Sequence, residues 1–196
     1  DELKWDRFHV VGNSMGGMIA QELALANPER ICTLHLNSTF SKLKMSYMTV
    51  RGVLGQISVA MEGKTGKTAS SKLLYPKQYL QDETEGQKNF ERTCAYLSET
   101  EESKPDPDGL KSQMGAILNH NMSRQKLIAL KETGIPIMIT CGNKDIVISP
   151  RASDYLIKIL EPVESIVWEG VGHVPFNQLL EEFNISMLRH CQRLSA

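Results

Sequence analysis

The sequence predicts an α/β fold in which helices flank a parallel sheet and a long, mostly helical insertion interrupts it. Apolar runs of strand length alternate with helix-like segments at both ends of the chain, while the middle lacks strong strands. We expect residues 1–38 and 134–196 to build the sheet layer and residues 39–133 to build the insertion.

The first part of the chain has a strand–helix–strand order. Residues 7–11 are an apolar run of strand length, and residues 16–26 follow as a helix that should end near Asn27-Pro28, because proline cannot continue it. Residues 31–37 form a second apolar strand. Two strands joined by a helix imply a right-handed crossover and therefore a parallel sheet.

The middle of the chain, residues 39–133, is rich in Met and polar residues. Helical periodicity occurs at 50–61, 87–97 and 110–118, and the acidic, proline-containing stretch 98–109 is typical of a solvated loop. The apolar residues of this region could hold an acyl or lipid-like group, but periodic apolar residues more often form buried helix faces, which we favour. They are Met45, Met48, Met61, Met114, Met122, Leu54, Ile57, Leu73, Leu74 and Leu118.

One motif in this region imitates a phosphate-binding loop. It is Gly63-Lys64-Thr65-Gly66-Lys67-Thr68, in which two residues separate the glycines where a Walker A motif requires four. No apolar strand leads into it, so we expect a flexible loop.

Apolar runs of strand length occur again at residues 135–141 and 165–168, and we expect a helix at 149–159 between them. A long helix at 175–194 completes the pattern. Its apolar positions fit a helix that packs through one face. They are Phe176, Leu179, Leu180, Phe183, Ile185, Met187 and Leu188.

Composition excludes several function classes. With 22 basic and 23 acidic residues the net charge is -1, and no basic stripe points to nucleic acid. No apolar run approaches the roughly 18–20 residues of a membrane span. The cysteines, at 32, 94, 141 and 191, have no metal spacing, and Cys32 and Cys141 lie in apolar runs as buried thiols. This pattern favours a reducing, intracellular, cytoplasmic location.

The sequence Gly12-Asn13-Ser14-Met15-Gly16 joins the first strand to the first helix. In a strand–turn–helix context, G-x-S-x-G forms the nucleophile elbow of serine hydrolases. Gly12 and Gly16 should leave room for a tight bend that strains Ser14 and exposes its hydroxyl, and the Met15 N–H should face a developing oxyanion. The alternative is a glycine-rich turn with an idle serine.

A nucleophilic serine needs a base, and the base needs an orienting acid. Asp145 follows the strand at 135–141, at the carboxyl end where open α/β sheets carry their sites; alternatively it is a turn aspartate or helix cap. His173 follows the strand at 165–168 in a glycine-rich turn. The order Ser14, Asp145, His173 predicts a catalytic triad.

The other histidines are weaker candidates. His9 and His35 lie inside predicted strands, and His190 lies in the last helix, where a structural role is expected. His120 lies in the insertion and could line a pocket, although we expect it to face solvent.

At this point the chain resembles the α/β-hydrolase family. The resemblance rests on Gly12-Asn13-Ser14-Met15-Gly16-Gly17, Gly142-Asn143-Lys144-Asp145 and Gly170-Val171-Gly172-His173, and covers essentially the whole chain. It implies Ser14 as nucleophile, Asp145 as acid, His173 as base, a lid at 39–133, and no metal or organic cofactor.

A complete member of this family has about four strands before the elbow, so the chain resembles the C-terminal two-thirds of such a hydrolase. We therefore expect an N-terminally truncated sheet, with the strand at 7–11 as an exposed edge. The second oxyanion donor would belong to the missing part, leaving the Met15 N–H.

The predicted function is hydrolysis of an ester, lipid or thioester through an acyl-enzyme, with a small-molecule acyl substrate as the partner. The alternative from another class is a non-catalytic or truncated scaffold that acts in binding. The same triad is also compatible with C–C bond hydrolysis or acyl transfer, because fold and triad do not fix chemistry.

Overall fold

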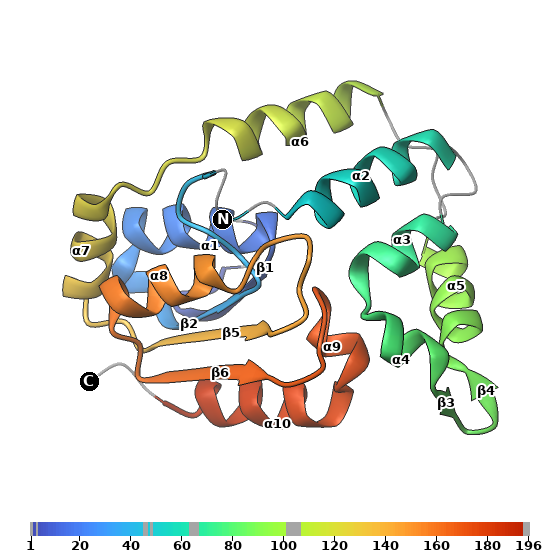
Figure 1. The fold of residues 1–196 in the computed structure, drawn as a ribbon. Coiled ribbons are helices and arrows are strands. Elements are labelled where there is room, and N and C mark those ends of the chain that lie inside the picture. The colour runs from blue at the N-terminus through green and yellow to red at the C-terminus, as the bar shows by residue number, and fades with distance from the viewer. Residues whose placement is uncertain are drawn as a thin grey trace.

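The computed structural model describes residues 2, 4–44, 47, 49–62, 67–100 and 107–193. Its centre is a four-stranded parallel sheet with the strand order β1-β2-β5-β6 (Figure 1). The strands are β1 (Phe8–Asn13), β2 (Ile31–Asn37), β5 (Ile137–Gly142) and β6 (Glu164–Trp168). The predicted fold class is confirmed, and every predicted strand occurs within two residues of its expected start.

Helices cover both faces of this sheet (Figure 1). On one face lie α1 (Met15–Ala26), α7 (Arg124–Glu132) and α8 (Arg151–Leu160), and on the other lies α10 (Leu180–Cys191). The main core forms between the first three helices and the sheet. Its fully buried members include Ile31, Leu34, Leu36, Leu127, Leu130, Ile139, Leu156 and Leu160.

Helix α1, which connects β1 to β2, ends where the sequence predicts. Helix α1 ends at Ala26, the backbone N–H of Asn27 bonds to the Leu23 carbonyl, and a short 3-10 helix then begins at Pro28. The predicted stop at Asn27-Pro28 is therefore confirmed.

The insertion is mostly helical in its described residues. It contains α2 (Val50–Glu62), α3 (Lys67–Leu74), α4 (Lys77–Gln81), α5 (Asn89–Thr100) and α6 (Pro107–Asn119). Figure 1 shows α3, α4 and α5 beyond the carboxyl ends of β5 and β6. Residues 63–66 of the glycine-rich motif and 101–106 of the acidic stretch lie outside the described residues, as do Met45 and Met48.

A small hairpin lies within the insertion, and its second strand takes up the first two residues of the helix expected at 87–97. Strands β3 (Glu83–Thr84) and β4 (Gln87–Lys88) pair antiparallel. Glu85 and Gly86 both have positive φ, 54° and 78°. A two-residue turn with two positive φ angles matches the right-handed twist of paired strands, so this Glu-Gly pair closes the hairpin.

Helix α7 lies within 39–133, yet it packs with α1 and α8 in the sheet layer. Leu127 and Leu130 on this helix are fully buried in the main core. The expected boundary at residue 133 stays a prediction, and the contacts place α7 beside the sheet.

The apolar residues of the insertion divide into two groups. Met122 and Leu73 are buried, but Leu54, Met114 and Leu118 are 58%, 48% and 61% exposed. The interpretation that these residues are simply buried helix faces therefore holds for only part of them.

The expected single helix at 175–194 is wrong. Helix α9 (Pro175–Gln178) ends at Leu179, whose φ of -130° and ψ of 59° lie outside the helical region, and α10 begins at Leu180. The Gln178 side chain explains the break, because it donates to the Gly170 carbonyl and accepts from the Gly172 N–H. These bonds tie α9 to the loop before it.

The expected packing of this segment through its apolar residues is also only partly correct. Phe183 is buried, but Leu180, Ile185 and Leu188 are 60%, 62% and 58% exposed. Cys32, expected as a buried thiol, is half-buried, while Cys141 is buried and this burial raises the pKa of its thiol. None of the helices in the described residues is both long and apolar enough to cross a membrane.

Two buried histidines lie between β2 and α10. His35 and His190 are 1% and 0% exposed, and their rings are 6.4 Å apart. Burial lowers the pKa of His35 to about 3, with a further contribution from His190, and also lowers the pKa of His190. Both rings are therefore neutral in the folded protein at pH 7.

This burial makes stability depend on pH. Below about pH 6.5 the unfolded chain binds a proton at His35 that the folded protein does not bind. The free energy of unfolding therefore decreases as the pH is lowered. We expect a loss of about 2 kcal/mol from His35 between pH 6.5 and pH 5. Urea unfolding at several pH values measures this slope.

His35→Gln removes the titrating group but keeps a side-chain donor, so it should flatten the slope. His9→Gln, on an exposed residue, should keep it because His35 is intact. Equal slopes for His35→Gln and the unchanged protein would contradict the assignment.

Candidate functional site

Ser14 occupies the turn between β1 and α1 in a strained conformation. Its φ is 54° and its ψ is -119°, a region that residues with a side chain rarely adopt. A Cβ atom on Gly12 would lie 2.5 Å from the Gly16 carbonyl oxygen, so this close approach requires glycine. A Cβ on Gly16 would meet open space, whereas one on Gly17 would lie 2.6 Å from Thr39. The steric need thus falls on Gly12 and Gly17 rather than on Gly16.

The end of β2 holds this turn in place. The Ser14 N–H donates to the Asn37 carbonyl at 3.0 Å, and the Thr39 hydroxyl donates to the Ser14 carbonyl at 2.7 Å. The Ser14 side chain does not cap α1. Met15 is the first residue of α1, so its N–H has no intrahelical acceptor and can serve as an oxyanion donor.

Asp145 and His173 form a buried hydrogen-bonded pair. His173 Nδ1 lies 2.7 Å from Asp145 Oδ2, and the two residues are each 4% exposed. The other carboxylate oxygen, Oδ1, accepts the backbone N–H groups of Val147 and Ile148 at 2.9 and 3.0 Å. Asp145 thus makes turn contacts through Oδ1 and a hydrogen bond to the imidazole through Oδ2, and its role as the acid stays a prediction.

Backbone hydrogen bonds join the loop that carries Asp145 to the segment that leads to His173. Asn143 N donates to the Trp168 carbonyl at 2.9 Å, and Lys144 N donates to the Val171 carbonyl at 2.8 Å. Gly142 allows this approach, because a Cβ atom there would collide with the Val171 carbonyl. The separation of Asp145 and His173 is therefore set by paired main chains.

The insertion contacts His173 directly. The His173 N–H donates to the Leu74 carbonyl, at the end of α3, at 2.9 Å. A Cβ atom on Gly172 would collide with the same carbonyl, so glycine is needed before the histidine as well. Neither contact follows from the triad motif alone.

A buried chain of side-chain hydrogen bonds runs beneath the elbow. Asn37 donates to Asn13 Oδ1 at 2.6 Å, Thr140 donates to Asn37 Oδ1 at 2.7 Å, and His35 Nε2 bonds to the Thr140 hydroxyl at 2.7 Å. Asn37 and Thr140 are fully buried. Sequence reasoning missed both residues, although a polar residue inside an apolar strand is a signal that could have identified them.

The structure brings Asp145 and His173 together but bonds neither side chain to that of Ser14 in the described residues. Ser14 follows β1, Asp145 follows β5 and His173 follows β6, all at the carboxyl edge of the sheet. Within the described part of the chain, no hydrogen bond joins Ser14 Oγ to the His173 ring.

The remaining histidines are placed as follows. His35 and His190 are buried, as a structural role requires, and His9 is exposed and bonds to Thr33 at 2.9 Å. His120 does not simply face solvent, which corrects the expectation, because it is half-buried and lines a cavity beside α1. The described residues include no group of three or more His, Cys, Asp or Glu side chains that could hold a metal ion.

Solved structures share this fold. A 2-hydroxy-6-oxo-6-phenylhexa-2,4-dienoate hydrolase from Rhodococcus sp. strain RHA1 superimposes with a TM-score of 0.70 at 18% identity, covering 96% of this chain and 65% of its own. The enzyme MGS-M2, from a deep-sea metagenome library, gives 0.73 at 16% identity, covering 100% and 68%.

Sequence comparison finds relatives among characterised proteins. A pimeloyl-[acyl-carrier protein] methyl ester esterase from Neisseria meningitidis serogroup C is 23% identical over 174 residues, which are 89% of this chain and 65% of the esterase. Lipase 1 of Psychrobacter immobilis is 37% identical over 59 residues, 30% of this chain and 18% of the lipase. The chain thus spans less than two-thirds of the length of each. The family model described as the alpha/beta hydrolase fold matches residues 1–178, and the chain belongs to this family.

Proposed function

We propose that the protein is a serine hydrolase of a carboxylic ester, lipid or thioester. The observation that carries the proposal is the buried His173–Asp145 hydrogen bond of 2.7 Å, at the same sheet edge as the strained Ser14. A buried carboxylate on Nδ1 fixes the imidazole tautomer so that Nε2 is left as the base. In enzymes without ligand, the bond from nucleophile to base is often long and tightens with substrate.

The proposed reaction proceeds in two steps. Ser14 Oγ attacks the acyl carbon while His173 takes the hydroxyl proton, and the Met15 N–H stabilises the oxyanion. His173 then passes the proton to the leaving alcohol or thiol, and an acyl-enzyme remains. Water, deprotonated by His173, attacks this acyl-enzyme; the acid leaves and the proton returns to Ser14.

An acyl substrate is supported by a cavity and by the relatives. A cavity of about 1410 Å³ lies between the insertion and the Asp145 loop; Leu54, Leu73 and Phe90 are among its apolar lining, and Asp145 lines it whereas Ser14 and His173 do not. The relative from Neisseria meningitidis is named as a methyl ester esterase and that from Psychrobacter immobilis as a lipase. We propose residues 39–133 as the lid that shapes this cavity.

A second candidate function is a scaffold that binds without catalysis. The absence of a hydrogen bond between Ser14 and His173 in the described residues favours it, because an idle serine needs no base. Activation of Ser14 separates the two candidates.

The first prediction concerns covalent labelling of Ser14. A fluorophosphonate should label the protein, because such probes react with serines activated by a base. Ser14→Ala should lose the label, while Ser112→Ala, on an exposed residue of α6, should keep it. Gel fluorescence reads the result, and an unlabelled but folded protein would support the binding scaffold instead.

The second prediction concerns Asp145. Asp145→Asn preserves the side-chain shape but removes the charge and disturbs the imidazole tautomer, so kcat for p-nitrophenyl butyrate should fall about 10³–10⁴-fold. Asp154→Asn, on the exposed side of α8, is the matched control and should hydrolyse the ester normally. Near-normal turnover by Asp145→Asn would exclude Asp145 as the acid.

The third prediction concerns the hydrogen-bonded chain beneath the elbow. Thr140→Val leaves the Asn37 oxygen and the His35 N–H without partners in a buried site, which should destabilise the fold by about 1–3 kcal/mol. Labelling of Ser14 should also slow, because Asn37 positions the elbow. Thr140→Ser keeps the hydroxyl and should restore both quantities; failure of this rescue would show that the lost hydrogen bonds of the hydroxyl are not the cause.

A further inference from the structure

Basic side chains are in excess around the cavity between the insertion and the Asp145 loop. They are Arg51, Lys72, Lys77 and Lys144, which belong to α2, α3, α4 and the turn after β5. All four residues are exposed, so their charged groups are open to a ligand that enters the cavity. The whole chain has a net charge of -1, so this positive charge is a local feature and does not follow from the composition.

The acidic residues of the same lining, Asp82 and Asp145, do not neutralise these cations. The Asp145 side chain is fully buried, and its two oxygens are bonded to His173 and to two backbone N–H groups. Asp82 Oδ1 accepts a hydrogen bond from the Gln78 side chain at 3.2 Å. Among the residues that the structure describes, none of the four basic side chains takes part in an ion pair.

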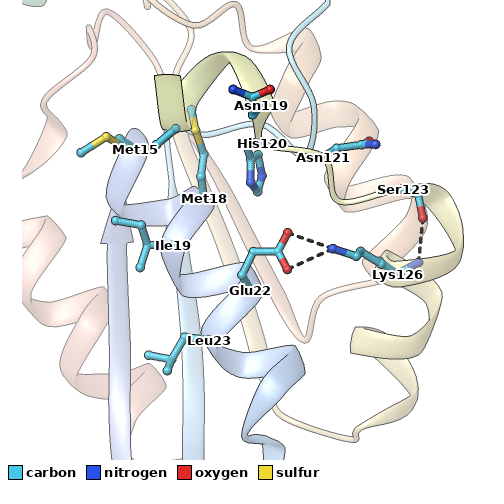
Figure 2. A pocket seen from close by; sticks show the side chains of 11 residues that line it. Met15, Met18, Ile19, Glu22, Leu23, Asn119, His120, Asn121, Ser123 and Lys126 are labelled. Atoms are coloured by element: carbon cyan, nitrogen blue, oxygen red, sulfur yellow. Dashed lines mark hydrogen bonds and ion pairs between the residues drawn. The ribbon is translucent and has the colours of Figure 1, made fainter. Parts of the chain in front are cut away.

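A second cavity, along α1, differs in its charge. Lys126 lines it and lies 3.1 and 3.2 Å from the two carboxylate oxygens of Glu22, as the dashed lines in Figure 2 mark. These two charges offset each other, so the cavity along α1 does not favour an ion of either sign. The cavity beside the insertion has unpaired positive charge instead, and Coulomb attraction favours an anion there.

The helices that supply the cations also supply apolar groups. On α2, Arg51 precedes Leu54 by three residues, and on α3, Lys72 follows Ala69 by three, so each helix has a cation and an apolar side chain on the face that lines the cavity. Phe90 extends the apolar lining. The volume of about 1410 Å³ exceeds the roughly 300–1,000 Å³ of most small-molecule sites, so an extended chain and its head group both fit.

We propose that this cavity binds an aliphatic chain that ends in an anionic group. The chain lies on the apolar lining, and the anion lies among the basic side chains of α2, α3, α4 and the turn after β5. A neutral group of the same size fills the same space but gains no Coulomb energy. The matching substrate class is an ester or thioester whose acyl chain carries a carboxylate away from the bond that breaks. This substrate class rests on the proposed hydrolase function, whereas the binding of the anion does not.

The test compares octanoate with octanamide, which have the same chain but differ in charge, as probes of protein labelled with ¹³C at the leucine methyl groups. Both should shift the Leu54 and Leu73 resonances saturably, because both residues line the cavity. One exposed ion pair contributes up to about fivefold in affinity, so octanoate, which meets several cations, should bind about tenfold more tightly at low ionic strength. Salt at about 0.5 M should remove most of this preference, because it screens exposed charges.

A pair of double variants assigns the preference to the cavity. Lys72→Gln with Lys77→Gln removes two exposed cations, so the preference for octanoate should fall to about threefold or less. Lys111→Gln with Lys158→Gln, at exposed residues outside the cavity lining, changes the net charge equally and should keep the preference. Equal affinity of the unchanged protein for both ligands would overturn the proposal. So would unmoved Leu54 and Leu73 resonances, or a full preference in the Lys72 and Lys77 variant.

A kinetic measurement tests the substrate class separately. At low ionic strength the p-nitrophenyl monoester of suberic acid should have a kcat/KM about tenfold above that of the same ester with a terminal carboxamide. Equal values would overturn the substrate class. If neither ester is hydrolysed and a fluorophosphonate does not label Ser14, the proposed hydrolase function is wrong. The relative affinity of octanoate and octanamide still decides the binding inference in that case.

Discussion

The fold and the site depend on one buried row of hydrogen bonds that crosses three strands at the carboxyl edge of the sheet. Asn13, Asn37 and Thr140 are direct register neighbours on β1, β2 and β5, so their side chains line up on one face. His35 lies two residues before Asn37 on the same face and ends the row at Thr140. A slip of one residue in any pairing would move these polar groups to the opposite face and leave each without its partner.

This row explains why the elbow is held so tightly. Ser14 follows Asn13 directly, and its N–H donates to the carbonyl of Asn37, which also anchors the row. The positive φ of Ser14 costs conformational energy of order 1–3 kcal/mol, so it persists only where neighbouring contacts fix it. Strands β1 and β2 therefore stabilise a conformation that the turn sequence alone would not keep.

Much of the architecture was predictable, because apolar runs and glycine turns are local signals. The strands, the end of α1 and the order of Ser14, Asp145 and His173 all follow from such signals. What the sequence could not provide depends on distant partners. The break at Leu179 depends on Gln178 bonding to the 170–172 loop, and the need for Gly17 depends on Thr39. The hairpin at 83–88 had a local signal in Glu85-Gly86, but its strands are too short to show periodicity.

The position of His173 depends on segments that lie far apart in the sequence. Its side chain bonds to Asp145, its loop pairs with the β5 turn, and its backbone N–H bonds to Leu74 of the insertion. Two features fix the contact with Leu74. The His173 N–H donates to its carbonyl, and Gly172 lacks a side chain that would collide with the same carbonyl. A movement that separated Leu74 from His173 would leave a buried N–H without an acceptor, at a cost of about 1–3 kcal/mol. This bond therefore favours keeping the α3–α4 junction and the His173 loop together.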